Sequence, residues 1–305
     1  MPLSMFQRIG VLLALTVLAA AWAVGSPAAP RAAAAAPRSA ATPVSYLLAA
    51  QNADGGFGPG IHQRSSPLYS GWAALGLAAA GEKLANVRHH GQSLLHYLQD
   101  TPQGSDSGSL ERTILALCAA GVRPHALLAE LGNRIRRDGS VSGQTNLTAF
   151  AVLALRAAGM HPPARTIAWL THQQDGDGGF NFDTGGQRTT SDVDDSGAVL
   201  EALAGTGQRQ VINRVIRFLD RNQNPDGGFP SAPGGPSNAQ STAFAAQGLI
   251  AVGAPRPGYA LAYLRSLTIS DGSIDYARSD SLTPVWVTAQ AEMALASRPL
   301  PLTGR

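Results

Sequence analysis

The sequence is poor in cysteine, lysine and aromatic residues. Cys118 is the only cysteine and Lys83 the only lysine among 305 residues, and aromatic residues make up 6%. A single cysteine excludes an intramolecular disulfide, so a large apolar core must stabilise the fold. The arginines are scattered without a basic run, which excludes the usual signature of a nucleic-acid-binding protein.

Motifs for metal or cofactor binding are missing as well. The seven histidines show no ligand spacing, and no glycine loop followed by lysine is present to bind phosphate. The segment Asp175–Gly179 resembles the start of a calcium loop, but position 12 of such a loop would be Gly186 instead of the required glutamate. We therefore predict no metal and no cofactor, and interpret these aspartates as turn formers.

Both ends of the chain differ from the rest. The apolar run Ile9–Val24 after a short basic start predicts a signal peptide over 1–24, and hence an extracytoplasmic protein that is membrane-anchored only if this segment is not cleaved. Ala and Pro dominate 25–42, which is typical of a linker. We predict a tail over 298–305, where LPLTG matches a sortase signal without the hydrophobic segment that normally follows it, a coincidence or a truncated signal.

Between these ends the sequence repeats. Three segments share an aromatic-Leu pair, a glutamine and then Asp-Gly-Gly-Phe: 46–58, 169–181 and 218–230. This pattern predicts the C-terminus of a helix, where glycine provides the positive φ that a sharp exit needs and the phenylalanine folds back onto the next unit. Weaker copies occur at 97–109, 134–143 and 263–276.

A second Ala/Leu-rich helix follows each turn, and the six copies align without gaps from Leu68, Gly108, Asn146, Asp194, Gln240 and Pro284. Five of them end in glycine, as expected just past a helix C-terminus. Six pairs of helices at a period of 40–50 residues predict a repeat architecture. Because neither terminal unit carries a polar cap, we expect a closed ring, an all-α α6/α6 toroid over 43–297.

The Q-x-x-D-G-G-F turns resemble the prenyltransferase and squalene-oxidase repeats of the terpenoid cyclase / protein prenyltransferase superfamily, whose members share this toroid. The resemblance covers nearly all of 43–297. Its zinc-dependent members place a cysteine two residues after an aspartate, whereas Asp194 follows Asp192 here. Because the superfamily contains both enzymes and carriers, the fold does not decide the function.

One motif does suggest chemistry. Asp192, Asp194 and Asp195 form DVDD, which resembles the DxDD motif of class II terpenoid cyclases such as squalene–hopene cyclase. The resemblance implies that Asp194 protonates an alkene while Asp192 and Asp195 tune it. Neighbouring carboxylates raise a carboxyl pKa, as a proton donor requires, whereas a helix N-terminus shifts it by less than one unit in the other direction.

Helix capping explains the same residues without catalysis. Asp194 shares its column with Gly108, Asn146 and Gln240, and polar residues fill the column of Asp192 as well. Asp, Asn and Ser at helix starts accept hydrogen bonds from backbone N–H groups, and losing a cap costs about 1 kcal/mol. On this interpretation the acids are structural.

The aromatic residues leave two possibilities open. Trp72, Phe150 and Phe244 share one column and form either an inward-facing ligand site or packing between helices. Class II cyclases resemble one another in placing the site between two helical domains, so a cyclase would need a second subunit here. We therefore favour a secreted, non-catalytic binding or scaffold module for a small apolar, amphipathic or polyprenyl-like ligand; the alternative is a class II cyclase-like enzyme with Asp194 as general acid.

Overall fold

The computed structural model describes residues 40–303 apart from 103, 183–190, 256 and 279. The predicted signal peptide and almost all of the predicted linker therefore lie outside the described residues. None of the helices within the described ranges is long and apolar enough to cross a membrane.

Helices dominate the described residues. The first helix of each pair is α1 (Pro43–Ala50), α3 (Leu94–Asp100), α5 (His125–Arg134), α7 (Ala164–His172), α9 (Arg209–Asn222) and α11 (Gly258–Ser266). The second is α2 (Pro67–Ala79), α4 (Ser107–Ala119), α6 (Thr145–Ala157), α8 (Val193–Leu203), α10 (Ala239–Ala251) and α12 (Pro284–Leu295). The strands β1 (Phe229–Pro230) and β2 (Ser237–Asn238) form one short antiparallel pair. The all-α prediction is confirmed.

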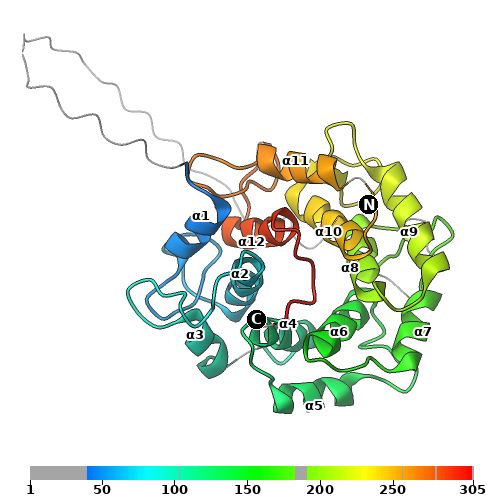
Figure 1. Cartoon of the computed structure of the whole chain (residues 1–305), viewed down its shortest axis with the longest axis horizontal. Coiled ribbons are helices and arrows are strands. Elements are labelled where there is room, and N and C mark those ends of the chain that lie inside the picture. Colours follow the sequence, from blue (N-terminus) through cyan, green and yellow to red (C-terminus); the bar gives the residue numbers. More distant parts are fainter. Residues whose placement is uncertain (1–39, 103, 183–190, 256, 279, 304–305) are drawn as a thin grey trace, which may run out of the picture. The chain divides into compact units, whose positions relative to one another are not determined.

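The second helices form a closed inner ring (Figure 1). Each of them contacts the next along the chain, and α12 contacts α2, so the sixth pair meets the first. The odd-numbered helices surround this ring on the outside. The predicted α6/α6 toroid is therefore correct.

Small residues let the inner helices pack closely. A Cβ atom on Gly197 of α8 would lie 2.5 Å from the carbonyl oxygen of Phe244 on α10, and one on Gly248 of α10 would lie 2.6 Å from the carbonyl oxygen of Gly197. These helices are buried on nearly all sides, which explains their continuous apolar sequence.

The turns between paired helices follow the predicted design. In the three strong copies the first glycine after the aspartate has a positive φ of 88°, 93° or 86°, at Gly55, Gly178 and Gly227. The aspartate accepts the N–H of the second glycine, as Asp177 does from Gly179 at 3.0 Å. The following phenylalanines, Phe57, Phe180 and Phe229, are fully buried.

A buried hydroxyl connects each strong turn to its inner helix. Phe57, Phe180 and Phe229 donate their N–H groups to the side-chain oxygens of Ser70, Ser196 and Thr242, respectively. In the sixth unit Thr288 accepts from Ile274 in the same way. The gapless alignment places Thr288 two columns too late, so the predicted register of the sixth unit is wrong by two residues.

The chain after α12 turns into the centre of the ring (Figure 1). Arg298 Nη1 donates to the carbonyl oxygens of Ala78 and Ala79 at 3.0 and 3.3 Å, and the N–H of Leu300 donates to Glu201 Oε1. Leu300 and Leu302 are only 3% and 4% exposed. This segment contains the first residues of the LPLTG motif and is packed against the inner helices.

Candidate functional site

The three acids lie at the start of α8, but they do not share one role. Asp192 is the N-cap, and its Oδ1 accepts the N–H of Asp195 at 2.7 Å. Asp106 of α4 and Asn238 of α10 cap their helices in the same way. Asp192 therefore acts as an ordinary N-cap residue.

Ser196 also has a structural position. Its Oγ accepts the N–H of Phe180 at 2.9 Å and donates to the carbonyl oxygen of Asp192 at 2.5 Å. The hydroxyl thus fixes the start of α8 to the preceding turn.

Asp194 is in a different environment. Its Oδ1 is shielded from solvent and has no hydrogen-bond partner among the described residues. Burial raises the pKa of Asp194 to about 7, the negative charge of Asp192 adds to this, and a side-chain hydrogen bond with Ser241 opposes it. At neutral pH this carboxyl is therefore protonated in a large fraction of molecules, as a proton donor must be.

The pKa values of the two neighbouring acids are raised as well. Burial, followed by the nearby charge of Asp192, raises the pKa of Asp195 well above its usual range. Burial also raises the pKa of Asp192, although hydrogen bonds from Asp195 oppose the shift. Burial thus acts on all three acids in the same direction, toward a higher pKa, and the proximity of Asp192 adds to it at Asp194 and Asp195.

The aromatic residues predicted for the site lie together. The rings of Trp72 and Phe150 meet edge to face with centroids 6.1 Å apart, and those of Phe150 and Phe244 at 6.5 Å. Their helices α2, α6 and α10 alternate around the ring and are not neighbours, so the side chains contact one another across its centre. These rings therefore face inward and do not merely pack between adjacent helices.

Sequence alignment missed a fourth ring. Trp286 of α12 stacks on Trp72 with centroids 5.9 Å apart and an interplanar angle of 15°. With the register of the sixth unit corrected by two residues, Trp286 falls in the column of Asp194, one helical turn before the column of Trp72, Phe150 and Phe244. The indole Nε1 atoms of Trp72 and Trp286 are buried without a hydrogen-bond partner in the part of the chain that the structure describes.

The acids and the rings of Trp72, Phe150 and Phe244 belong to successive layers. Ala198 shares the column of Trp72, Phe150 and Phe244, and Asp194 precedes it by one helical turn. At 1.5 Å per residue, Asp194 lies about 6 Å nearer the N-terminal rim of the ring. A molecule that contacts the aromatic rings therefore has the Asp194 carboxyl immediately above it.

Arg112 on α4 shares the alignment column of Trp72, Phe150 and Phe244. The sequence patterns had not identified it as a site residue. Its side chain lies against Gly71 of α2, where a Cβ atom would be 2.9 Å from Arg112 Cδ. Its Nη2 donates to Ser109 Oγ at 3.2 Å, and no carboxylate among the described residues lies within ion-pair distance. Arg112 thus contributes a positive charge at the level of Trp72, Phe150 and Phe244.

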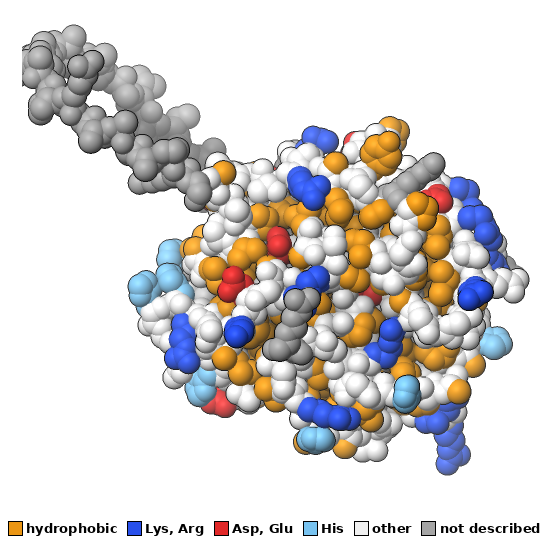
Figure 2. All heavy atoms as spheres, in the orientation of Figure 1, with side chains coloured by type: hydrophobic (Ala, Val, Ile, Leu, Met, Phe, Trp, Pro, Cys, Tyr) orange, Lys and Arg blue, Asp and Glu red, His pale blue; other side chains and the backbone are white. Residues whose placement is uncertain are grey.

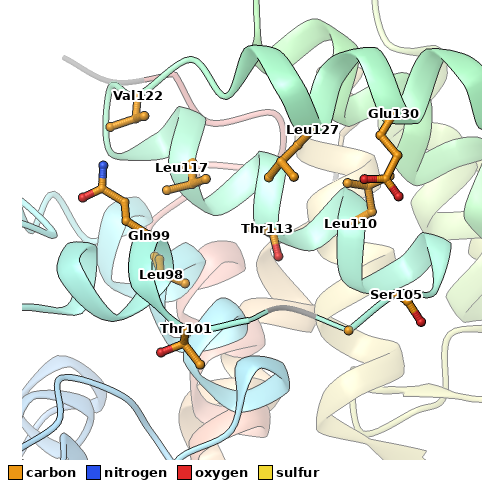
Figure 3. Close-up of a pocket in the computed structure, with 11 residues that line it drawn as sticks. Leu98, Gln99, Thr101, Ser105, Leu110, Thr113, Leu117, Val122, Leu127 and Glu130 are labelled. Atoms are coloured by element: carbon orange, nitrogen blue, oxygen red, sulfur yellow. The ribbon is translucent and has the colours of Figure 1, made fainter.

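Other features of the molecule do not join this site. No group of three or more His, Cys, Asp and Glu side chains in the described ranges could hold a metal ion. A hollow of 570 Å³ lies between α3, α4 and α5, lined by leucines such as Leu110 and Leu117 and by Glu130 (Figure 3). It contains none of the predicted site residues. Arginine and lysine side chains are dispersed over the face shown in Figure 2.

A closed ring of paired helices defines the class of α-α toroid proteins. The prenyltransferase alpha-alpha toroid domain model matches residues 11–117 and 195–282, more than half of the chain. The chain therefore belongs to this family, and the predicted resemblance is confirmed.

Curated relatives are enzymes. Drimenyl diphosphate synthase from Streptantibioticus cattleyicolor is 34% identical over 177 residues, which cover 49% of this chain and 32% of the relative. The corresponding enzyme from Streptomyces showdoensis is 34% identical over 136 residues, 40% of this chain and 25% of the relative. The chain thus spans about a third or less of the length of these relatives.

Solved structures show the same fold. The type II terpene cyclase MstE from Scytonema matches with a TM-score of 0.60 and 15% identity over 83% of this chain and 95% of that chain. An ent-copalyl diphosphate synthase from Streptomyces platensis matches with a TM-score of 0.52 and 18% identity over 76% and 50%. A glycosidase also matches, with a TM-score of 0.58 and 13% identity over 84% and 94%.

These findings correct the functional prediction. The sequence favoured a non-catalytic binding or scaffold module, whereas the curated relatives are synthases and the solved neighbours include type II terpene cyclases. The error arose from two arguments: that polar columns imply caps, and that a cyclase site needs a second helical domain. In the structure Asp194 does not cap α8, and the rings of Trp72, Phe150, Phe244 and Trp286 form one connected cluster.

Proposed function

We propose that this protein is a class II terpene-cyclase-like enzyme in which Asp194 is the general acid and a polyprenyl compound is the substrate. The observation that carries the proposal is the Asp194 carboxyl itself. Its Oδ1 is buried and unpartnered within the described residues, its pKa is raised to about 7, and it lies one turn above a cluster of inward-facing rings.

The chemistry is a proton transfer followed by carbon–carbon bond formation. The Asp194 O–H bond breaks as the π electrons of an alkene form a new C–H bond, which leaves a carboxylate on the enzyme and a cation on the other alkene carbon. A second double bond attacks that cation and closes a ring. Loss of a proton ends the reaction, so the product is an isomer of the substrate, and solvent restores the proton to Asp194.

Aromatic faces support this sequence of cations. A cation within about 6 Å of a ring centroid gains roughly 0.5–2 kcal/mol from the ring quadrupole, most strongly at tryptophan. Trp72 and Trp286 present the two indoles of the cluster, with Phe150 and Phe244 beside them. We assign these four residues to substrate binding.

The comparisons support the substrate class. MstE variants have been solved in complex with geranylgeranyl dihydroxybenzoate, the substrate, and with merosterolic acid A, the product. The curated relatives are drimenyl diphosphate synthases. A polyprenyl chain with a polar or anionic head is therefore the compound that we propose for this protein.

One ring is a reasonable unit for the activity. The match covers 95% of the MstE chain, which hardly extends beyond the toroid shared with this protein. We therefore place the reaction within a single chain, and the second subunit expected from the sequence is not required by this proposal.

Turnover of polyprenyl substrates tests the function. Purified protein is incubated with farnesyl diphosphate, geranylgeranyl diphosphate and squalene, and the extracts are analysed for cyclic isomers. We expect Asp194→Asn to lower turnover by about 10²–10⁴-fold, the usual contribution of a general acid. Asp220→Asn on the exposed side of α9 serves as the control. Equal turnover by Asp194→Asn and the wild type would refute the assignment.

A further inference from the structure

Residues 298–302 form a segment that crosses the ring from one inner helix to the opposite one. Arg298 binds the carbonyl oxygens of Ala78 and Ala79 at the C-terminal end of α2. Two residues later, the N–H of Leu300 donates to Glu201 Oε1 on α8. Because α2 and α8 are three places apart in a ring of six, the segment spans the centre (Figure 1).

Both attachments suit the groups involved. The last carbonyl groups of a helix have no partner within the helix and carry a partial negative charge, which a guanidinium satisfies. Glu201 is fully buried, and its carboxyl obtains a backbone N–H from this segment. The segment therefore adds a donor to the end of α2, where the carbonyl oxygen of Ala78 also accepts the N–H of Gly81 at 3.1 Å, and provides one for Glu201.

The depth of the segment places it below the aromatic rings. Asp194, Ala198 and Glu201 follow the i, i+4, i+7 spacing of one helix face. Glu201 lies three residues beyond the aromatic column, or about 4.5 Å farther from the acid rim. The order along the axis is thus the Asp194 carboxyl, the aromatic cluster, the Leu300 backbone, and finally the helix end that Arg298 binds.

The two leucines of the segment are buried although they belong to no helix. Leu300 and Leu302 are 3% and 4% exposed, and both belong to the core cluster that includes the inner helices. An apolar chain that extends past the aromatic rings along the axis would therefore meet this segment.

We propose that residues 298–302 close the far end of the ring and that Leu300 and Leu302 limit the length of the polyprenyl chain that the protein accepts. Ligands then enter and leave on the side of Asp194. The length limit rests on the proposed function, whereas the closure of the ring does not.

Ligand length is the variable that tests the limit. We would measure the binding of farnesol, geranylgeraniol and squalene to the full chain by quenching of tryptophan fluorescence. Leu300→Ala and Leu302→Ala remove buried carbon atoms from the segment, and Leu302→Val is a milder variant in case alanine prevents folding. Leu282→Ala, at an exposed site, is the matched control.

We expect the ratio of the dissociation constants for geranylgeraniol and farnesol to shift toward the longer ligand by about tenfold in Leu302→Ala, the scale that one or two buried methylene groups provide. Leu282→Ala should keep the wild-type ratio. An unchanged ratio in folded Leu300→Ala, Leu302→Ala and Leu302→Val would overturn the length limit.

A separate measurement tests the closure. If the wild type binds none of the three ligands, the proposed function fails, but hydrogen exchange still examines the segment. We expect the Leu300 amide to exchange as slowly as amides of the inner helices, and Glu201→Ala to speed its exchange at least tenfold. Exchange at the rate of an unstructured peptide in the wild type would overturn the closure.

Discussion

Glu201→Gln should change how the stability of the protein depends on pH. Glu201 is buried within the inner ring, and burial raises its pKa from 4.5 to about 8, although the hydrogen bond from Leu300 and the charge of Arg156 oppose the shift. A carboxyl whose pKa is raised by folding stabilises the protein when protonated. That stability is complete below the unfolded pKa and is lost as the pH rises through the folded value.

The magnitude follows from the two pKa values. Each pH unit between them costs about 1.36 kcal/mol, so raising the pH from 5 to 8 removes on the order of 3 kcal/mol of unfolding free energy through Glu201. Glutamine does not titrate, and its side-chain oxygen can still accept the N–H of Leu300. The variant should therefore gain stability relative to the wild type by this amount over the same range.

Urea unfolding followed by circular dichroism at pH 5 and pH 8 measures the effect. The quantity of interest is the difference in unfolding free energy between variant and wild type, because the other buried carboxyls contribute equally to both. Asp220→Asn, which removes a carboxyl from the exposed side of α9, controls for net charge. A Glu201→Gln difference that stays within 1 kcal/mol between the two pH values would refute the reasoning.

Three further predictions test other parts of the account. If Asp194 donates the proton, kcat/KM should be constant below its pKa of about 7 and fall tenfold per pH unit above it, whereas a flat profile from pH 6 to pH 9 would exclude this acid. Gly248→Ala places a methyl group 2.6 Å from the carbonyl oxygen of Gly197 and should destabilise the protein by about 1–3 kcal/mol. Gly132→Ala, on the exposed side of α5 with no atom near its Cβ, should stabilise the protein by about 0.5–1 kcal/mol. Thermal unfolding measures both variants, and a shift of the same sign in the two melting temperatures would contradict the prediction. Finally, if residues 1–24 are a signal peptide, the protein exported by a secreting host should lack them in an intact mass measurement, and a full-length mass would contradict the predicted cleavage.

Local sequence patterns predicted the fold because each repeat encodes its own turn. The aspartate and glycine of the Asp-Gly-Gly-Phe segments are needed for a hydrogen bond and a positive φ, so they identify a turn without tertiary information. Glycine just past an inner helix likewise indicates a positive φ at the helix end, and Gly81 and Gly121 have φ values of 96° and 81°. Closure was predicted because neither terminal unit carries a polar cap.

The site was less predictable because it depends on which face of a helix points inward. Asp192 and Asp194 are two residues apart and both occupy polar columns, yet Asp192 caps the helix whereas Asp194 has a buried carboxyl oxygen with no partner among the described residues. Trp286 was missed because it does not share the aromatic column: once the register of the sixth unit is corrected by two residues, it lies in the column of Asp194. The contact between Leu300 and Glu201 joins residues 99 positions apart, which no local pattern reports.

Isotope incorporation tests most directly whether Asp194 protonates the substrate. When the protein turns over a polyprenyl substrate in D₂O, the Asp194 carboxyl exchanges with solvent before each reaction, so we predict a cyclic product that contains one non-exchangeable deuterium, and no such product from Asp194→Asn. A cyclic product that carries no deuterium, or one that Asp194→Asn forms at the wild-type rate, would contradict the account.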